Sequence, residues 1–338
     1  MSGQLTESSP TRIRAAAIQL DAVVGDVATN VAKVERLAED AIARSGARLV
    51  AVPEFFTSQL PFDRRVHRAV LPPENVAVDM LRAVARRHGC WIGGSMLIAE
   101  HGGIRNRYHL VEPSGRMHLH DKDLPTMWEN AFYGPGQDDG VFATDLGAVG
   151  AAVCWELIRS GTARRLRGRV GVVVTGTHWW TLPSNWPLIP RLLESISQYN
   201  RYLSENAPAE LARRVGAPVL QASHCGRFST DFMLLPGSSW GLPYATEFVG
   251  CTQIVDAGGH VLVQRQTQEG AGFVAADIDI GIGTPVLPIE DRFWIPALPL
   301  AIRAYWHHQN ACGKAYYRSH GLRAGLATVG DAGGTAIR

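Results

Sequence analysis

The chain has 338 residues, of which 46% are hydrophobic and 19% are charged, and its formal net charge is +2. This composition is ample for the core of one large α/β domain or two smaller ones. The near-neutral charge argues against a nucleic-acid partner, and the absence of the apolar run of about 18 residues that a membrane helix needs argues against a membrane partner.

Residues 1–11 are polar, and we expect this stretch to be disordered. It lacks the cationic start and apolar stretch of a secretion signal, so we expect a soluble, cytoplasmic protein. The cysteines are odd in number and widely spaced, with no Cys-x-x-Cys pair, which argues against a disulfide framework and a zinc site. They are Cys90, Cys154, Cys225, Cys251 and Cys312.

The first folded segment is predicted to be a β-α-β unit. Apolar residues favour a strand over residues 12–20, and residues 30–45 carry apolar side chains at helical spacing. Gly46 supplies a helix stop, and a second strand follows over residues 48–52. Active groups commonly lie beyond the carboxyl ends of such strands, and Glu54 lies there.

Glu54 stands between a proline and two phenylalanines, Phe55 and Phe56. If its side chain faces inward, the loss of water raises its pKa toward the range of a general base. The alternative is a surface-loop glutamate that merely follows a strand.

The middle of the chain is predicted to add paired strands, so that the sheet becomes mixed in direction. A turn signal at residues 113–115 separates two of them. The predicted elements are a helix over 73–89 and strands over 90–99, 108–111 and 116–120.

Lys122 follows the last of these strands, and Pro125 prevents the strand from continuing. Its cation is therefore expected where the chain leaves the sheet, unless it is an ordinary surface lysine. His118 and His120 share a strand face with it and could form a two-histidine metal site. Further ligands do not stand nearby in a recognisable pattern, so we expect no metal and no cofactor.

Residues 148–153 are a small, apolar, strand-favouring run that ends at Cys154. Residues 142–144 supply the partner strand of a hairpin, and residues 158–169 favour a helix. Cys154 is therefore expected at a strand-to-helix turn, where the positive end of the helix dipole favours the thiolate. The alternative is a buried cysteine that acts as a small hydrophobe.

The rest of the chain is predicted to complete the sheet and then to become helical. Residues 184–216 favour one or two helices, and Gly258-Gly259 marks a hairpin turn. Residues 296–320 look helical, whereas the Gly/Ala-rich residues 324–338 are expected to be loose. Strands are predicted over residues 170–175, 217–223, 232–235, 252–256, 261–264 and 273–278.

A base, a cation and a thiol thus come in order at three strand ends, which is what acyl or imidoyl transfer requires. From about Arg12 to Ile280 the chain resembles the nitrilase superfamily of carbon–nitrogen hydrolases. The resemblance is carried by Pro53-Glu54-Phe55-Phe56, by Lys122 with Pro125-Thr126 and Glu129, by Val153-Cys154-Trp155-Glu156, by Gly250 to Asp256 with Gly259, and by Ala276 to Asp279.

The resemblance implies an α/β fold, a four-layer α-β-β-α sandwich, with a hydrolase domain over residues 12–285 and a C-terminal extension over residues 286–338. It implies that thiol-dependent hydrolysis turns a small nitrile or amide into a carboxylic acid and ammonia. The implied roles are Glu54 as general base, Lys122 as stabiliser of the tetrahedral intermediate, Cys154 as nucleophile, Glu129 as a further active-site glutamate, and the backbone N–H of Trp155 as an oxyanion donor.

Aromatic residues near these motifs are candidates for an apolar substrate pocket. The resemblance also implies a homo-oligomer, with the apolar residues 293–317 as an exposed contact strip. Residues 184–208 are an apparent insertion into the family pattern, so the substrate class stays open. The candidate pocket residues are Trp128, Phe132, Tyr133, Trp155, His178, Trp179 and Trp180.

Four other interpretations remain. Gly237 to Gly241 fits the G-x-S-x-G pattern of serine hydrolases, with Ser239 as nucleophile, but no helix is expected after it. Cys225, beside His224, is another conceivable thiol nucleophile. The same triad could also serve an acyl or amide transferase, or the chain could be a non-catalytic binding member of the family.

Overall fold

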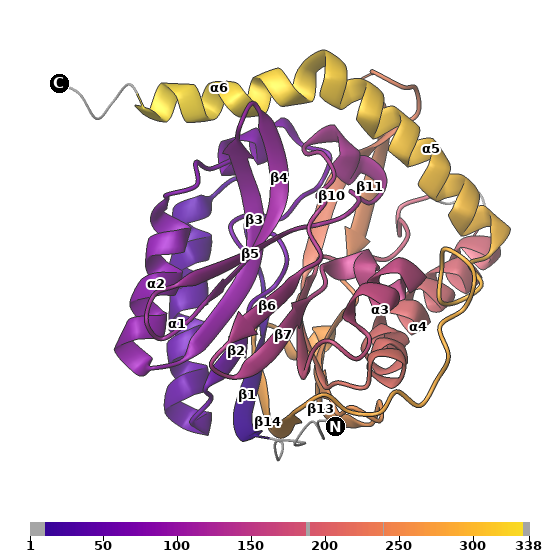
Figure 1. The fold of residues 1–338 in the computed structure, drawn as a ribbon. Helices are drawn as coiled ribbons and strands as arrows, with labels where there is room; N and C mark the ends of the chain where they lie inside the picture. Colours follow the sequence, from indigo (N-terminus) through magenta and orange to yellow (C-terminus); the bar gives the residue numbers. More distant parts are fainter. Residues whose placement is uncertain (1–10, 187–189, 239, 334–338) are drawn as a thin grey trace, which may run out of the picture.

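The computed structural model describes residues 11–186, 190–238 and 240–333 (Figure 1). It has the predicted mixed α/β fold. Twelve of the strands in these ranges form one sheet, which divides into two halves, and a separate hairpin joins β10 (Arg227–Met233) to β11 (Gly241–Glu247).

The first half of the sheet is built around the N-terminal strand. β1 pairs with β2 in parallel and with β14 in the antiparallel sense, and the order across this half is β5-β4-β3-β2-β1-β14. Its strands are β1 (Thr11–Leu20), β2 (Leu49–Ala51), β3 (Trp91–Glu100), β4 (Gly103–Val111), β5 (Met117–Asp121) and β14 (Gly272–Ile280).

The second half has the order β6-β7-β8-β9-β12-β13. It joins the first half where the carboxyl ends of β1 and β9 pair, at Gln19 with Ser223 and Leu20 with His224. The glycine pair at residues 258–259 turns the β12–β13 hairpin, as predicted. The strands are β6 (Val141–Thr144), β7 (Gly147–Ala151), β8 (Val172–Thr177), β9 (Val219–His224), β12 (Gly250–Val255) and β13 (Val261–Gln266).

Helices cover the outer faces of the two halves and complete the four-layer arrangement (Figure 1). On one side lie α1 (Val27–Ser45) and α2 (Val76–His88), and on the other lie α3 (Ser160–Leu166) and α4 (Pro190–Val215). Short helical turns connect several elements: η1 (Arg64–Ala69), η2 (Met127–Ala131), η3 (Cys154–Ile158) and η4 (Thr267–Glu269).

Helix α1 illustrates why these residues fold as they do. The Asp26 side chain accepts a hydrogen bond from the backbone of Thr29 and so begins the helix earlier than the apolar pattern alone predicts. The helix ends at Gly46, whose φ of 71° suits glycine. Val31 and Val34 are among the side chains it buries against the sheet, and burying a valine fully stabilises the fold by about 1.5–3 kcal/mol.

The segment that the sequence marks as an insertion, residues 184–208, contributes most of helix α4. This helix has 26 residues with Pro208 in its interior, and it continues into the stretch that ends at Val215. Leu211 and Val215 are buried. Neither α4 nor any other helix in the described ranges combines the length and apolarity needed to cross a bilayer.

The C-terminal extension differs from the sequence-based prediction in two ways. Residues 324–338 were expected to be loose, but α5 (Leu300–Tyr316), η5 (Tyr317–Gly321) and α6 (Leu322–Gly333) form one helical run up to Gly333. The contact of α6 with β3, β4 and η1 supplies the apolar surface that a short glycine-containing helix needs for stability. Residues 334–338 lie outside the described ranges, as do residues 1–10, and Thr11 already belongs to β1.

The expected exposed strip at residues 293–317 is also largely turned inward. Ile302 and Tyr316 are each 5% exposed, because they pack against the same chain, whereas Leu300 is 78% exposed. Association into homo-oligomers stays a prediction.

The serine-hydrolase interpretation fails on the fold. Gly237 and Gly241 flank the connection between two antiparallel strands, β10 and β11, whereas a nucleophile elbow needs a helix after its strand. Ser239 itself lies outside the described residues.

One glycine controls how closely the two halves of the sheet approach each other at the strand ends. A Cβ atom added to Gly176 in β8 would lie 2.2 Å from the backbone nitrogen of Glu54 and 2.5 Å from the carbonyl carbon of Pro53. Both neighbours are backbone atoms, which cannot rotate away. The chain that leaves β2 with Glu54 therefore depends on the missing side chain at Gly176.

We expect Gly176→Ala to lower the free energy of unfolding by about 1–3 kcal/mol, because overpacking must push the Glu54 backbone aside. Chemical denaturation measures this loss. Gly161→Ala is the matched control, because a Cβ on this exposed helical glycine meets no atom within 4 Å, and alanine there is expected to be neutral or stabilising by up to about 1 kcal/mol. Equal stability of the two variants would contradict the close approach.

Candidate active site

The carboxyl ends of β2, β5 and β7 lie at the same edge of the sheet. Strands β2, β3, β7, β8 and β9 run in the same direction. Strand β5 shares that direction, because β4 is antiparallel to both β3 and β5. Glu54 follows β2, Lys122 follows β5 and Cys154 begins the turn η3 after β7. The structure brings these three residues together, as their positions at strand ends predict.

A buried ion pair with three members forms the centre of the site. The Lys122 ammonium lies 2.8 Å from Oε1 of Glu54 and 2.7 Å from Oε2 of Glu129, and all three side chains are fully buried. Asn106 Nδ2 donates to Oε1 of Glu54 at 2.8 Å, and the hydroxyl of Tyr133 donates to Oε2 of Glu129 at 2.5 Å. These bonds fix the orientation of both carboxylates.

Each glutamate keeps one buried oxygen without a hydrogen-bond partner among the described residues: Oε2 of Glu54 and Oε1 of Glu129. Buried polar atoms are nearly always paired, so unpaired acceptors on two carboxylates that share one lysine point to a ligand or a transferred proton. The thiol of Cys154 is an electrostatic neighbour of both carboxylates.

Burial sets the protonation of the base and the thiol. It raises the pKa of Glu54 to about 7, although the charge of Lys122 opposes the shift. Burial, with the negative charge of Glu54, also raises the pKa of Cys154 well above its usual value, and Lys122 offsets this only in part. The expectation that a helix dipole would favour the thiolate is therefore wrong for the resting site, where the thiol is neutral.

Lys122 itself stays charged. Burial lowers the pKa of its ammonium, but the carboxylates of Glu129 and Glu54 more than offset that effect and hold the pKa well above its ordinary value. The site therefore holds a fixed cation beside a neutral thiol and a carboxyl that titrates near neutrality.

Backbone strain concentrates at this site. Positive φ angles occur at Phe55 (51°), Met127 (57°) and Cys154 (54°), each of which lies in one of the three turns that carry the site. Such conformations cost a non-glycine residue of order 1–3 kcal/mol and persist where the surroundings enforce them. Here they turn the side chains of neighbouring residues toward a common point.

Glu156 ties the nucleophile turn to the lysine turn. Its carboxylate accepts hydrogen bonds from the backbone of Val153 at 2.5 Å and of Asp123 at 3.0 Å, and it lies 3.0 Å from Nε2 of His120. Burial lowers the pKa of His120, but Glu156 and Asp138 outweigh it and raise the value to about 9, so His120 is a cation.

The two-histidine metal hypothesis does not fit these contacts. His120 is engaged by Glu156 and by Asp138, the latter at 2.5 Å, while His118 pairs with Glu112 at 2.7 Å. The described residues contain no group of three or more side chains arranged to hold a metal ion.

A cavity of about 190 Å³ opens above Cys154 and Glu129. Its walls are almost entirely apolar and aromatic. They are formed by Thr126, Met127, Trp155, Trp179, Trp180, Thr181, Leu182, Pro183, Trp186, Ile196, Asn200, Ala301, Ile302 and Tyr305.

The predicted pocket residues are only partly in this wall. Trp155, Trp179 and Trp180 line the cavity, but four others lie behind it. Trp128 stacks on Trp180 at 4.5 Å, Phe132 packs against Phe62 and His67, Tyr133 bonds to Glu129, and the ring of His178 accepts a hydrogen bond from the backbone of Leu60 at 3.0 Å. Proximity in sequence to a motif does not specify which face of a turn a ring occupies.

All five cysteines are free thiols and all are buried. Cys225, the alternative nucleophile, follows β9, and burial raises its pKa to about 11. It lies outside the cavity wall, and the charged groups that influence it are Asp21, Arg265 and Lys33. The ring of the neighbouring His224 is also buried, but its Nε2 donates a hydrogen bond to the backbone carbonyl of Glu54 at 2.6 Å.

Comparison with known proteins agrees with this geometry. The carbon–nitrogen hydrolase family model matches residues 14–284. The chain belongs to the carbon–nitrogen hydrolase family. A bifunctional nitrilase/nitrile hydratase from Lupinus angustifolius is 24% identical and covers 80% of this chain and 79% of its own length. An omega-amidase from Xenopus tropicalis is 29% identical over 49% of this chain and 64% of its own length.

Solved structures of the family share the fold. A carbon–nitrogen hydrolase superfamily protein from Xanthomonas campestris has a TM-score of 0.61 at 20% identity and covers 80% of this chain and 91% of its own. An amidase from Nesterenkonia sp. AN1 has a TM-score of 0.55 at 20% identity, with 83% of this chain and 96% of its own covered.

Several residues of the site were missed in the sequence. Asn106 orients Glu54, and its signal was present: it is a polar residue at an inward position of a strand whose inward neighbours, Ile104, Tyr108 and Leu110, are apolar. The wall residues Trp186, Ile196, Ile302 and Tyr305 gave no local signal, because their segments reach the cavity only through tertiary packing.

The ion pair predicts how stability depends on Lys122. Lys122→Met leaves two buried carboxylates without their cation, and we expect the free energy of unfolding to fall by about 3–5 kcal/mol at neutral pH. In this variant mutual repulsion raises the carboxyl pKa above the unfolded value. Stability is then retained at acid pH, below the unfolded pKa, and is lost as the pH rises. Melting temperatures at pH 5 and pH 8 measure the effect.

Glu54→Gln is the matched control, because it leaves Lys122 and Glu129 as a neutral pair at 2.7 Å. We expect its stability to stay near that of the wild type at both pH values. A Lys122→Met variant as stable as the wild type at pH 8 would contradict the buried ion pair.

Proposed function

We propose that this chain hydrolyses the carbon–nitrogen bond of a small, uncharged nitrile through a covalent intermediate on Cys154. The observation that carries the proposal is the buried Lys122 between two carboxylates, beside a neutral thiol at the bottom of an apolar cavity. In this assignment Glu54 is the general base, Lys122 and the backbone N–H of Trp155 stabilise developing negative charge, and Glu129 positions Lys122 and the substrate.

The first step adds the thiol across the nitrile. The sulfur of Cys154 forms a bond to the nitrile carbon as its proton passes to Glu54, and Glu54 returns the proton to the nitrile nitrogen, which gives a thioimidate. Since the thiol pKa is raised by burial, the proton must leave as the S–C bond forms, and the free oxygen of Glu54 is available to receive it.

Two water molecules complete the reaction. The first adds to the thioimidate carbon, and Glu54 relays the water's two protons in turn to the nitrogen. The C–N bond then breaks and ammonia leaves, so that a thioester remains. The second water attacks the thioester, the C–S bond breaks, the acid is released and the thiol regains its proton. Negative charge that develops at each tetrahedral stage lies within reach of the Lys122 ammonium, where a fixed charge in a dry site is most effective.

The size and lining of the cavity support one substrate class. Its volume of about 190 Å³ exceeds the roughly 150 Å³ of an apolar cavity that holds benzene. Among the described residues the only charged side chain in the walls is Glu129, which is already paired with Lys122, so the charge of a free ammonium or carboxylate on the substrate would not be compensated. We therefore assign substrates with an aryl or bulky apolar group next to the reacting carbon.

An amide is the second candidate substrate, because Oε1 of Glu129 is an unpaired acceptor at the cavity and an amide NH₂ would satisfy it. The names of the relatives support both chemistries, since they include nitrilases and amidases. In a glutamate-to-glutamine mutant of the Nesterenkonia amidase, acrylamide is joined to the active-site cysteine by Michael addition. The product distinguishes hydrolysis from the transferase alternative. Hydrolysis releases the free acid, whereas a transferase would join the acyl group to an amine.

Cys154→Ala is expected to abolish turnover of phenylacetonitrile and phenylacetamide by roughly four to six orders of magnitude, as for other covalent nucleophiles, without a large change in melting temperature. Ammonia release measures the rate. Cys225→Ala is the control, since it removes another buried thiol outside the cavity and is expected to leave turnover intact. Retained turnover in Cys154→Ala would refute the proposal, and a wild type that binds but never releases acid would favour a non-catalytic member.

The raised pKa of Glu54 predicts an acid limb in the pH profile. The base must be ionised to take the thiol proton, so kcat/KM should fall about tenfold per pH unit below pH 7, the region of the Glu54 pKa. The pKa of the Cys154 thiol lies well above its ordinary value, so we expect no second rise of kcat/KM from thiolate formation at neutral pH. Steady-state rates between pH 5 and pH 9 test this, and a flat profile down to pH 5 would contradict Glu54 as the base.

A further inference from the structure

The cavity has a wall that the family domain does not supply. Ala301, Ile302 and Tyr305 of helix α5 line it, yet all three lie beyond residue 284, where the family match ends. We propose that this inner face of α5 is the specificity wall of the site and sets the length of the apolar group that the substrate carries. The inference rests on the proposed function, because it assigns to the apolar group of the substrate the part of the cavity that the reacting carbon does not occupy.

The wall is fastened directly to the turn that carries Glu129. Oδ1 of Asn310 in α5 accepts hydrogen bonds from the backbone of Met127 at 2.8 Å and from Nδ2 of Asn130 at 3.0 Å. Both partners flank Glu129 in η2. The strained φ of 57° at Met127 therefore lies at the anchoring point of the C-terminal helix.

Close packing supports the same contact. A Cβ atom on Gly313 of α5 would lie 2.8 Å from Cβ of Asn130 and 3.0 Å from the backbone nitrogen of Ala131. One turn further along, Tyr316 packs edge-on against Phe62 with ring centroids 5.0 Å apart. These contacts hold the second half of α5, and the wall residues belong to the first turns of the same helix. Fixed apolar walls discriminate substrates by size.

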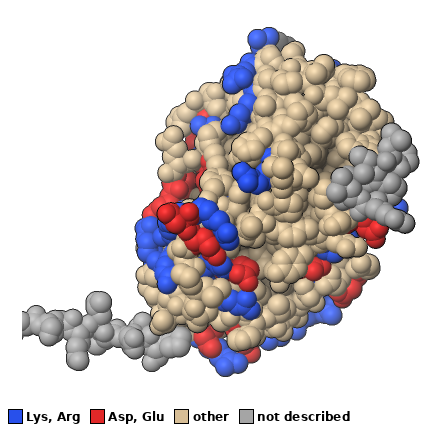
Figure 2. All heavy atoms as spheres, turned by 90° about the vertical axis from the view of Figure 1, so that its right-hand side faces the viewer, with Lys and Arg blue, Asp and Glu red and all other residues tan. Residues whose placement is uncertain are grey.

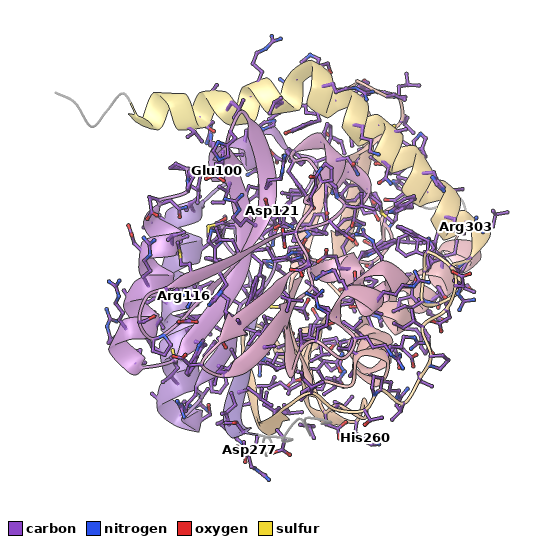
Figure 3. The ribbon with its side chains drawn as sticks, viewed as in Figure 1. Glu100, Arg116, Asp121, His260, Asp277 and Arg303 are labelled. Carbon is purple, nitrogen blue, oxygen red and sulfur yellow. The ribbon has the colours of Figure 1, made fainter. Side chains whose placement is uncertain are left out.

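The two faces of α5 differ as a specificity wall requires. Ile302 is 5% exposed and faces the cavity, whereas Leu300 is 78% exposed. Arg303 points away from the body of the protein (Figure 3). The side of the molecule on which α4 and α5 lie is formed mostly by uncharged residues, and most of its acidic and basic side chains lie toward the periphery of the view (Figure 2).

A chain-length series tests the wall. The probes are benzonitrile, phenylacetonitrile, 3-phenylpropionitrile and 4-phenylbutyronitrile, with the matching amides, and the readout is the ratio of kcat/KM for the longest probe to that for the shortest. Ile302→Ala opens the wall and should raise this ratio by about 10- to 100-fold, the discrimination that a hydrophobic pocket typically shows per methylene group. Ile302→Phe should lower it.

Leu300→Ala is the matched control, because it shortens an aliphatic side chain on the solvent face of the same helix and should leave the ratio at the wild-type value. Ile302→Val removes one methyl group and should give a smaller shift in the same direction as Ile302→Ala, which keeps the test available if the larger truncation does not fold. An active Ile302 variant with the wild-type ratio would overturn the specificity wall alone. A wild-type enzyme that releases acid from none of the probes would overturn the proposed function and, with it, the wall.

Discussion

Three fully buried charges, Lys122 between Glu54 and Glu129, are the constraint on which the rest of the site depends. Removing charges from water is costly unless they are paired at close range, and one cation between two carboxylates leaves one negative charge uncompensated. The surroundings absorb that charge partly by hydrogen bonds from Asn106 and Tyr133, and partly by the raised pKa of Glu54, which titrates near neutrality. Burial and the uncompensated negative charge, which make folding less favourable, therefore also give Glu54 a pKa near neutrality, which suits the proposed role of general base.

The fold meets this constraint by joining distant segments at one sheet edge. The two half-sheets meet where β1 and β9 pair, and Gly176 permits the backbone contact that places Glu54 against β8. The carboxylate of Glu156 accepts hydrogen bonds both from the backbone before Cys154 and from the backbone after Lys122, so the turns that carry the thiol and the cation are cross-linked. A site assembled from three strand ends gains precision from such cross-links, since each turn alone would be mobile.

Much of this could be predicted, because it has a local cause. Strand ends follow from apolar runs that stop, so Glu54, Lys122 and Cys154 were placed correctly at them, and the glycine pair at residues 258–259 marked the β12–β13 hairpin. The failures have a common physical origin in long-range packing. The neutral thiol follows from burial and from the nearby carboxylates, and not from its own turn. Helix α6 is held by contacts with β3 and β4 that no periodicity within residues 324–333 reveals. The cavity wall combines side chains from residues 126 to 305, and its composition is therefore visible only in three dimensions.

Because the thiol of Cys154 is neutral at rest, the proposed reaction depends on how the substrate is placed in the cavity. A thiolate formed in advance would face Glu54 and Glu129 in a dry site and would be destabilised by both, so the nucleophile is generated only as its proton moves to Glu54 and an electrophilic carbon arrives. That coupling requires the substrate carbon to sit at bonding distance before any charge separates, and the placement depends on how the apolar group fits the walls. In the proposed mechanism helix α5 acts on the chemical step through geometry, since it is bonded to the Glu129 turn at Asn310 and touches the cavity at Ile302. Binding energy from the distant end of a substrate is then expressed in kcat as well as in KM, as expected when remote contacts align the reacting atoms.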